Sequence, residues 1–488
     1  MRQGWSYDAA FIEKLLSRAR NVIESRTLLI LTAVVLAAVA LMGIDRTGAV
    51  GERRNDFYLS NSGDDNADGR TPATAWRTLD RLARQRLEPG VRVLLDGGDV
   101  FEGTLRLGAD DAGDVNRPVW IGSYGTGRAT VAAGGGPGVL VQDTGGVRVG
   151  DLAIAGTGGA ADGVTVFTDR PGTRPSGIVV EDLEVSGFRN GVSIGATRSD
   201  AGFHGVQVRR VVASDNRGSG VATYGPAFDA VSPVYVNTDI TVSEVVAYRN
   251  TGDPAAQVNT GNGIVLGSVS GGRVVGSVAY ENGAGSLAPE GPYGIWAYDS
   301  TGVVIERNIS HHNRTGSADG GGFDLDQNTS NCVLQHNLSY SNDGPGYLLF
   351  SNAANRAHTG NVIRFNSSVD DGRRGDFYGG ITIMGGLSGP ASATGIFDAQ
   401  VYGNAVTVSR SAAKTPPVVR IAGTLSGIVV SGNVFTAYDD AALVQAENFT
   451  VGGIMLRDNT YHSPFPIVGW AGSRYATMAE WRSATGQH

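Results

Sequence analysis

The chain has 488 residues, a formal net charge of -8 at pH 7, 72 glycines and a single cysteine, Cys332. An acidic balance without a basic run argues against nucleic acid as a partner. One cysteine excludes an internal disulfide framework and a cysteine-based zinc site, and the presence of only two lysines disfavours a lysine base.

Residues 27–44 form the first predicted element, an uncharged apolar run close to the minimum length of a membrane-spanning helix. Basic residues between positions 14 and 26 precede it, so the positive-inside rule places residues 1–26 in the cytoplasm. A cleaved signal peptide is the alternative, but the preceding segment is long and residues 47–49 make a weak cleavage site. We therefore expect a signal anchor, a linker over residues 45–55 and an extracytoplasmic chain beyond it, at a bacterial cell surface.

Two short repeating units follow from about residue 135. The first begins with glycine and reads GVTVFT at Gly163, GVSIGA at Gly191, GVATYG at Gly220, GIVLGS at Gly263, GIWAYD at Gly294, GFDLDQ at Gly322, GYLLFS at Gly346 and GITIMG at Gly380. The second carries asparagines in register, at Asn308, Asn337, Asn366, Asn404, Asn433 and Asn459, with a further turn series at Asn216, Asn250, Asn282, Asn313 and Asn342. Short strands at a regular period with stacked turn asparagines predict an all-β, single-stranded parallel β-helix over residues 56–465, with a tail over 466–488.

Three quoted segments resemble known proteins. They are FYLSNSGDDNADGRTPATAWRTLDRL from Phe57, VLLDGGDVFEGTLRL from Val93 and YATMAEWRSATGQ from Tyr475. They look like parts of extracellular right-handed β-helix proteins of the pectate-lyase-like superfamily, and the last is similar to a helical tail of carbohydrate-active members. The resemblance covers about residues 55–488. It implies the fold and a short C-terminal helix, but this fold hosts hydrolases, lyases, epimerases and adhesins.

Side-chain alternation predicts which residues of the glycine-initiated unit face the core. Positions one and three after the glycine are mostly apolar, as in Phe323 and Leu325, and face inward, so positions two and four face out. On this rung the outward residues are Asp324 and Asp326. The neighbouring outward aromatic residues are Trp296, Tyr298, Phe350 and, further back, Tyr224. Exposed aromatic residues around a carboxylate pair are typical of a sugar-binding groove, although ordinary packing under a loop is the alternative.

The aspartate pair has three interpretations. It is a solvated surface, a calcium site that Asp299 and Asp343 complete, or the acid and base of an enzyme. Two strand residues separate the β-carbons by about 6.6 Å, within the range of about 6.5–9.5 Å that inverting glycosidases use between carboxyl groups. Asp319, in the preceding loop, is a third carboxylate that can replace either one. The phrase DGGGFDLD at Asp319 resembles a segment of β-helix glycoside hydrolases.

Weaker candidates lie in nearby loops. His312 and Arg314 end the preceding coil, where they contact substrate or act as base and neutraliser in a lyase. Glu290 and Tyr293 lie close to the Trp296 rung. His311 aligns with Tyr248, Tyr280 and Tyr340, which predicts a stacked column of rings rather than a catalytic histidine.

The sequence therefore predicts a membrane-anchored, extracytoplasmic glycoside hydrolase that acts on a polysaccharide by an inverting, two-carboxylate mechanism. It predicts no cofactor, with calcium as the one possibility. A lyase or uronate epimerase on the same fold is the alternative enzyme, and the lack of an outward arginine in the column counts against it. A non-catalytic polysaccharide-binding or assembly protein is the other alternative. That alternative expects Trp296→Ala to remove glycan binding and Asp324→Asn to leave function intact.

Overall fold

The computed structural model describes residues 56–351, 358–374, 377–386, 394–465 and 467–487. The predicted cytoplasmic segment, membrane helix and linker lie outside these residues and stay predictions. Within the described ranges, no helix combines the length and the apolar composition needed to cross a bilayer. The predicted C-terminal helix is confirmed as α4 (Met478–Thr485), which Thr477 caps by accepting the amide hydrogen of Glu480.

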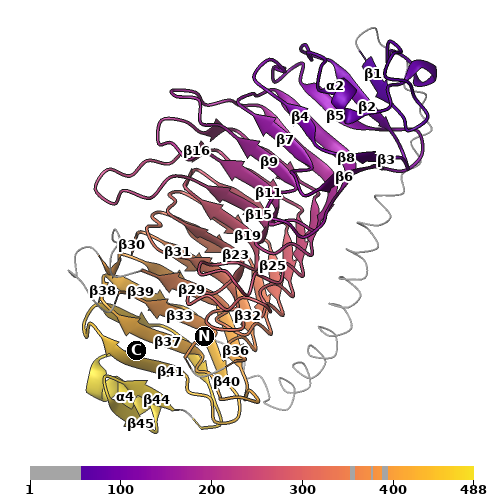
Figure 1. The fold of residues 1–488 in the computed structure, drawn as a ribbon. Coiled ribbons are helices and arrows are strands. Elements are labelled where there is room, and N and C mark those ends of the chain that lie inside the picture. Colours follow the sequence, from indigo (N-terminus) through magenta and orange to yellow (C-terminus); the bar gives the residue numbers. More distant parts are fainter. Residues whose placement is uncertain (1–55, 352–357, 375–376, 387–393, 466, 488) are drawn as a thin grey trace, which may run out of the picture. The chain divides into compact units, whose positions relative to one another are not determined.

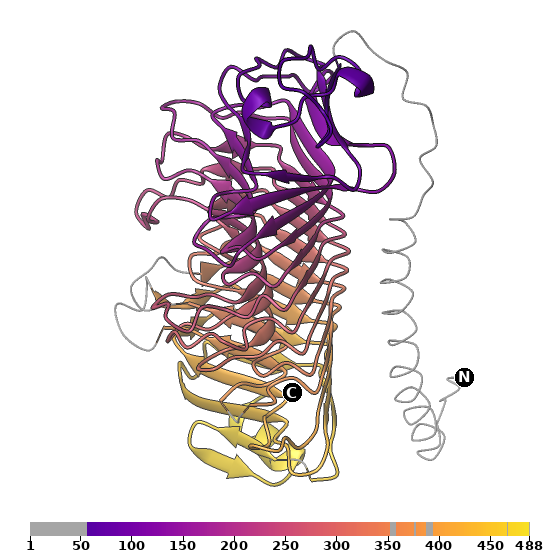
Figure 2. The same cartoon turned by 45° about the vertical axis from the view of Figure 1, so that its right-hand side comes forward.

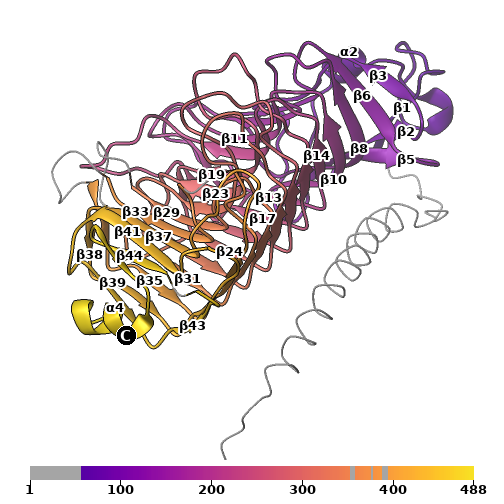
Figure 3. The ribbon, with the colours of Figure 1, turned by 90° about the horizontal axis from the view of Figure 1, so that it is seen from below.

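Parallel strands stack coil upon coil along the chain (Figures 1 and 2), as the repeats predict. One sheet, called here the site sheet, contains β4 (Leu105–Leu107), β7 (Val139–Gln142), β9 (Val164–Phe167), β11 (Asn190–Gly195), β15 (Ser219–Tyr224), β19 (Asn262–Gly267), β23 (Tyr293–Tyr298), β26 (Gly321–Leu325), β29 (Tyr347–Phe350), β33 (Ile381–Met384), β37 (Val419–Gly423), β41 (Val444–Phe449), β44 (Val468–Trp470) and β45 (Ser473–Tyr475). Every pairing in it is parallel except β44 with β45. The glycine-initiated units thus form one continuous sheet, whose strands lie side by side in Figure 3.

The asparagine-bearing units form two further rows of strands, which the long strands β8 and β10 join into one sheet. The first row contains β1 (Asp56–Leu59), β2 (Arg92–Asp96), β5 (Val119–Tyr124), β8 (Val147–Gly156), β10 (Ile178–Ser186), β13 (Gln207–Arg209), β17 (Thr241–Ser243), β21 (Arg273–Val275), β24 (Val304–Glu306), β27 (Val333–Gln335), β31 (Val362–Arg364), β35 (Gln400–Tyr402), β39 (Ile428–Ser431) and β42 (Ile454–Arg457). The second row contains β3 (Val100–Glu102), β6 (Ala129–Gly134), β14 (Val212–Ser214), β18 (Val246–Tyr248), β22 (Val278–Tyr280), β25 (Ile309–His311), β28 (Leu338–Tyr340), β32 (Ser367–Val369), β36 (Ala405–Val408), β40 (Val434–Ala437) and β43 (Thr460–His462).

Shorter elements complete the coils. They are the strands β12 (Phe203–His204), β16 (Asn237–Thr238), β20 (Val269–Ser270), β30 (His358–Thr359), β34 (Ile396–Phe397) and β38 (Leu425–Ser426), the 3-10 helix η1 (Pro72–Thr74) and the helix α2 (Leu79–Leu82). The strand period fits a solenoid, because each coil buries its apolar face only against the coils beside it.

The core is one continuous apolar interior. Inward residues of the site sheet follow one another in register and are buried. One such series is Ile264, Ile295, Phe323, Tyr347, Ile381 and Val419. The rings of Phe323 and Tyr347 stack with centroids 5.2 Å apart. Cys332 is buried in the same core, as predicted for a small hydrophobic residue.

Both predicted asparagine ladders are confirmed. In the first, each side chain bonds the next coil, as where Asn308 Nδ2 donates to Asn337 Oδ1 at 3.1 Å. In the second, Asn313 Nδ2 donates to Asn342 Oδ1 at 2.9 Å, and the series ends at the buried Asp371. These bonds satisfy buried turn amides that no strand ladder reaches.

Candidate active site

Register places the predicted carboxylate on the outer face of the site sheet. Asp324 on β26 pairs with Trp296 on β23 and with Leu348 on β29. The outer face is covered here, because only 1% of Asp324 and 6% of Trp296 are exposed. The prediction that Asp324 points outward is confirmed, but its interpretation as a solvated surface and that of Trp296 as an exposed sugar platform are wrong. Trp296 belongs to a small apolar cluster with Tyr293, Val265 and Leu348.

Hydrogen bonds explain why Trp296 turns into this cluster. Its indole Nε1 donates to Asn262 Oδ1 at 3.0 Å, and the same oxygen accepts the backbone amide of Tyr293 at 3.1 Å. A buried indole needs such a partner. Trp296 thus stabilises the start of β23, and Trp296→Ala, offered above as a test of glycan binding, instead leaves a cavity.

Three other predicted aromatic residues remain partly open. Tyr298 and Tyr224 are half-buried and lie flat across glycines of the preceding coil, so a Cβ on Gly267 would stand 2.4 Å from the Tyr298 Cζ. Phe350 is half-buried beside the same apolar cluster. These rings, rather than that of Trp296, are placed to contact a sugar.

Asp319 is the most strongly held carboxylate. It is half-buried in the loop before β26, with a left-handed backbone (φ 59°) that aspartate tolerates. Its Oδ2 accepts the Gly291 amide at 2.8 Å, and its Oδ1 accepts the hydroxyls of Tyr293 at 3.1 Å and Tyr378 at 2.5 Å. Burial raises the pKa of Asp319, whereas these three donors lower it by stabilising the anion.

Asp324 lies beneath this group with little to stabilise a charge. Its Oδ1 is buried and has no hydrogen-bond partner. Burial raises the pKa of Asp324 well above its usual range, and the carboxylates of Asp326 and Asp319 raise it further. Asp324 therefore keeps its proton to a higher pH than an exposed aspartate does.

This buried acid predicts a pH-dependent gain in stability for Asp324→Asn. In the folded chain Asp324 keeps its proton to a higher pH than in the unfolded chain. Below about pH 4 the carboxyl is protonated in both states, so it costs wild type no stability. Wild type then loses stability as pH rises through the folded pKa of Asp324. Asparagine stays neutral throughout. Because one pKa unit corresponds to about 1.4 kcal/mol, we expect the variant to be at least about 1 kcal/mol more stable than wild type at pH 8, and equal to it at pH 4.

Thermal unfolding followed by circular dichroism between pH 4 and pH 8 measures this difference. Asp458→Asn is the matched control, since Asp458 is exposed and has a left-handed backbone (φ 56°) that asparagine also adopts. A difference between Asp324→Asn and wild type that does not grow with pH contradicts the interpretation of Asp324 as a buried acid.

Asp326 follows directly after the last residue of β26 and is half-buried. Its Oδ1 accepts the Gln327 amide at 2.6 Å. Burial raises the pKa of Asp326 to about 8, and the negative charges of Asp319, Glu290 and Asp299 contribute. Asp299, whose pKa burial also raises, accepts a hydrogen bond of 2.5 Å from the Asn328 amide group.

The cluster consists of acidic groups. Within the described ranges, no arginine, lysine or histidine makes an ion pair with Asp319, Asp324 or Asp326. No three His, Cys, Asp or Glu side chains of that part of the chain converge as metal ligands, and the expectation of calcium stays untested. The arrangement suits proton transfer, since three neighbouring carboxyls in different environments hold their protons with different affinity.

Comparison with known proteins agrees with the observed architecture. A family model described as a right handed beta helix region matches residues 128–404, more than half of the chain. The chain belongs to this right-handed β-helix family. No curated protein matches the sequence of this β-helix protein.

Solved structures resemble the β-helix protein as a whole. The GH136 lacto-N-biosidase from Eubacterium ramulus has a TM-score of 0.59 at 18% identity, covering 83% of this chain and 68% of that one. A mannuronic acid specific family 6 polysaccharide lyase from human gut microbiota has a TM-score of 0.55 at 13% identity, covering 84% and 86%. The family 6 alginate lyase AlyGC has a TM-score of 0.53 at 12% identity, covering 84% and 54%. At such identities the likeness establishes the fold alone.

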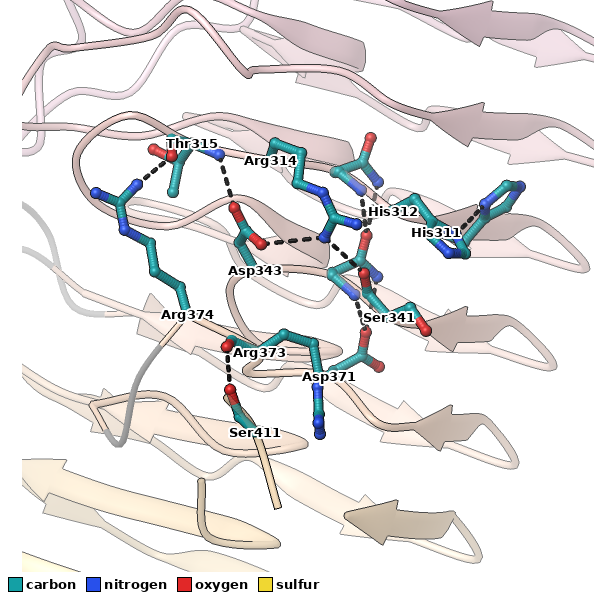
Figure 4. Close-up of polar contacts among 12 residues, drawn as sticks. His311, His312, Arg314, Thr315, Ser341, Asp343, Asp371, Arg373, Arg374 and Ser411 are labelled. Carbon is teal, nitrogen blue, oxygen red and sulfur yellow. Dashed lines mark hydrogen bonds and ion pairs between the residues drawn. The ribbon is translucent and has the colours of Figure 1, made fainter. Parts of the chain in front are cut away.

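His312 and Arg314 of the β-helix protein contact residues of their own coil and of the next one (Figure 4). Arg314 Nη1 donates to the Ser341 carbonyl and to Asp343 Oδ1, both at 3.0 Å. His312 has its ring nitrogen 2.9 Å from that of His311. The predicted ring column is confirmed, since His311 stacks between Tyr280 and Tyr340 at 5.1 and 4.6 Å.

Sequence reasoning missed Tyr378, which donates the shortest hydrogen bond to Asp319 although 59 residues separate them. It also missed Asn262, which orients Trp296 and Tyr293. A partial signal exists in hindsight: Tyr293 directly precedes the unit at Gly294, and Tyr378 lies two residues before the unit at Gly380. Both hydroxyls reach the same oxygen of Asp319.

Proposed function

We propose that the β-helix protein is a glycoside hydrolase that cleaves a polysaccharide with Asp319 and Asp326. The observation that carries this proposal is a cluster of three carboxyls with raised pKa values on β26 and directly beside it. Glycoside hydrolysis requires two carboxyls that hold their protons differently. Asp319 and Asp326 are the two members that reach the surface.

The hydrogen bonds assign a role to each. Asp319 accepts three hydrogen bonds that favour its ionised form, which suits the base. Asp326 accepts one and has acidic neighbours, so at neutral pH it holds a proton to donate. In the proposed reaction Asp326 protonates the glycosidic oxygen as the bond to the anomeric carbon breaks. Asp319 takes a proton from the water that attacks that carbon.

Asp324 has no access to solvent in this arrangement, and we assign it a positioning role. Because burial raises its pKa, Asp324 holds its proton more tightly than an exposed aspartate does, which limits the negative charge of the cluster. The strand spacing that predicted inversion concerns Asp324 and Asp326, and it does not apply to Asp319. One-dimensional proton NMR of the first-formed product anomer identifies inversion or retention.

Three carboxyls at the cleavage point favour hydrolysis over elimination or epimerisation. Those reactions act on a uronate and need a positive group to neutralise its carboxylate. The polysaccharide-binding alternative has no use for three adjacent carboxyls with raised pKa values. The location outside the cytoplasm rests on residues 27–44 and belongs to this proposal.

Mass spectrometry of products tests the proposal directly. The full chain is incubated with a panel of neutral and acidic polysaccharides, with Asp326→Asn as a blank. Fragments that carry one added water support hydrolysis. Fragments one water lighter, with an unsaturated end, contradict it and establish elimination. Binding without any cleavage across the panel supports the binding-protein alternative.

Tyr378→Phe tests the role of Asp319 as the base. Loss of the hydroxyl removes a donor that lowers the pKa of Asp319, so we expect the acid limb of the kcat/KM profile to move to higher pH. A hydrogen bond to a charged group contributes about 1.5–3 kcal/mol, which corresponds to a roughly 10- to 100-fold fall in kcat. KM stays near the wild-type value.

Tyr438→Phe is the control, because Tyr438 is an exposed tyrosine outside the carboxylate cluster. An unchanged acid limb in Tyr378→Phe, with kcat reduced, shows that Tyr378 supports the loop without tuning the base.

A further inference from the structure

An arginine lies in the same outward column as Asp324. Leu348 pairs with Thr382, and Thr382 pairs with Arg420 on β37. Arg420 is thus three rungs beyond Asp324, and at about 4.8 Å per rung the two backbones are about 14 Å apart. The expectation that the outward column lacks an arginine is wrong. The column is longer than the repeats indicated.

The guanidinium of Arg420 is largely buried, yet it makes few hydrogen bonds. Only 13% of the side chain is exposed, and Nε is buried without a hydrogen-bond partner. Within the described part of the chain its ion-pair partner is Glu447, with Nη2 and Oε2 3.5 Å apart. That distance is long for a charge-assisted hydrogen bond, whereas a buried guanidinium normally makes short, paired bonds. Donors of Arg420 are therefore left for a ligand.

The surroundings of Arg420 have the features of a sugar-binding site. The ring of Phe377 lies 6.0 Å from the guanidinium carbon, and 53% of Phe377 is exposed. Glu447 is half-exposed and also accepts a hydrogen bond of 3.0 Å from Gln445, which occupies the next rung of the column. Glu447 lines a hollow of about 450 Å³ together with Asn448, Phe449, Ala471 and Gly472. An aromatic face beside a half-paired arginine fits a sugar ring that carries a carboxylate.

We propose that Arg420 and Phe377 form a subsite for an acidic sugar, with the guanidinium binding the sugar carboxylate and the ring of Phe377 packing on the pyranose. This inference rests on the proposed hydrolase. The carboxylate cluster repels negative charge at the cleavage point, whereas Arg420 attracts it about 14 Å away. The substrate class is therefore a heteropolysaccharide, cut beside a neutral sugar and bearing a uronic acid further along the chain.

Affinity gel electrophoresis of the full chain tests this subsite. The probes are xanthan, gellan and hyaluronan, each compared with its carboxyl-reduced, neutral counterpart. Asp326→Asn serves as the background, so that cleavage does not remove the probe. We expect at least one native polymer to retard the chain, and Arg420→Gln to weaken that binding at least about 10-fold, the loss expected for one charge-assisted contact. Carboxyl reduction should weaken it equally.

Two further variants keep the result interpretable. Arg457→Gln is the matched control, because Arg457 is an exposed arginine on β42, outside the site sheet. Arg420→Lys keeps the positive charge but loses the planar guanidinium that donates two parallel hydrogen bonds to a carboxylate. Its affinity should therefore lie between that of wild type and that of Arg420→Gln. Equal retardation by native and reduced polymers, wild-type binding by Arg420→Gln, or retardation by none of the acidic polymers overturns the subsite.

The same variants separate failure of the subsite from failure of the hydrolase. With a polymer that is cleaved, Arg420→Gln should raise KM at least about 10-fold and leave kcat unchanged, since it removes binding far from the bond that breaks. Cleavage that Arg420→Gln does not affect overturns the subsite and leaves the hydrolase intact. If binding depends on Arg420 but no polymer is cleaved, the subsite is supported and the hydrolase is overturned.

Discussion

Asp326→Asn is expected to lower kcat by about 10²–10⁴-fold, the contribution of general acid catalysis, because the amide cannot donate the proton that the leaving oxygen needs. Asp319→Asn is expected to lower it as much by removing the base. Polysaccharide binding should persist in both variants. In the wild type, activity should fall as pH rises through about 8, where Asp326 loses its proton. Initial rates with reducing-end detection measure kcat and its pH dependence, and affinity gel electrophoresis measures polysaccharide binding.

The controls use chemically identical substitutions elsewhere. Asp458→Asn changes an exposed aspartate outside the cluster and should retain wild-type rates. If Asp324→Asn abolishes turnover while Asp319→Asn or Asp326→Asn retains it, the roles assigned here are reversed. In that case the buried acid must become accessible during the reaction. Unchanged turnover in all three variants rules out the carboxylate mechanism.

The site sheet could be predicted from the sequence because the sequence repeat follows from the stacking of the coils. Stacked coils force equivalent residues into register, so Trp296, Asp324 and Leu348 were placed on neighbouring strands correctly. Alternation also identified the outer face. Alternation does not show which parts of the chain pack over that face, because loops of irregular length do so. The burial of Asp324 and Trp296 could therefore not be predicted from the sequence.

Irregular coil length also hid Arg420. Successive ladder asparagines are 29 residues apart from Asn308 to Asn366, but 38 separate Asn366 from Asn404. The longer coil interrupts the repeat after Gly380, so the column could not be followed to β37 from sequence alone. Of the two residues that most extend the site, Tyr378 therefore lies inside the longer coil and Arg420 lies in the coil that follows it.

The ladder and the active site are mechanically connected through glycine. A Cβ on Gly322, at the start of the Asp324 unit, would stand 2.2 Å from Ser339 Oγ and 3.1 Å from Asn342 Nδ2. Gly294 meets Ser310 and Asn313 in the same way one coil earlier. The glycines that begin these two units are thus required by the serine and the asparagine packed against them. A change in the ladder should therefore disturb the strand that carries the carboxylates.

Asn342→Ala is accordingly expected to destabilise the chain by about 3 kcal/mol or more. The buried side chain accepts the backbone amide of Asn313 at 2.9 Å and donates to the Ser310 carbonyl at 3.1 Å, and each buried group left unpaired costs about 1–3 kcal/mol. Denaturant unfolding measures the loss, with the exposed Asn116→Ala as control. Hydrogen exchange should show faster opening at β26 and β29 than at β5, because coils stabilise only their neighbours. A midpoint equal to that of the control, or uniform exchange along the solenoid, means that the ladder does not hold the site strand in place.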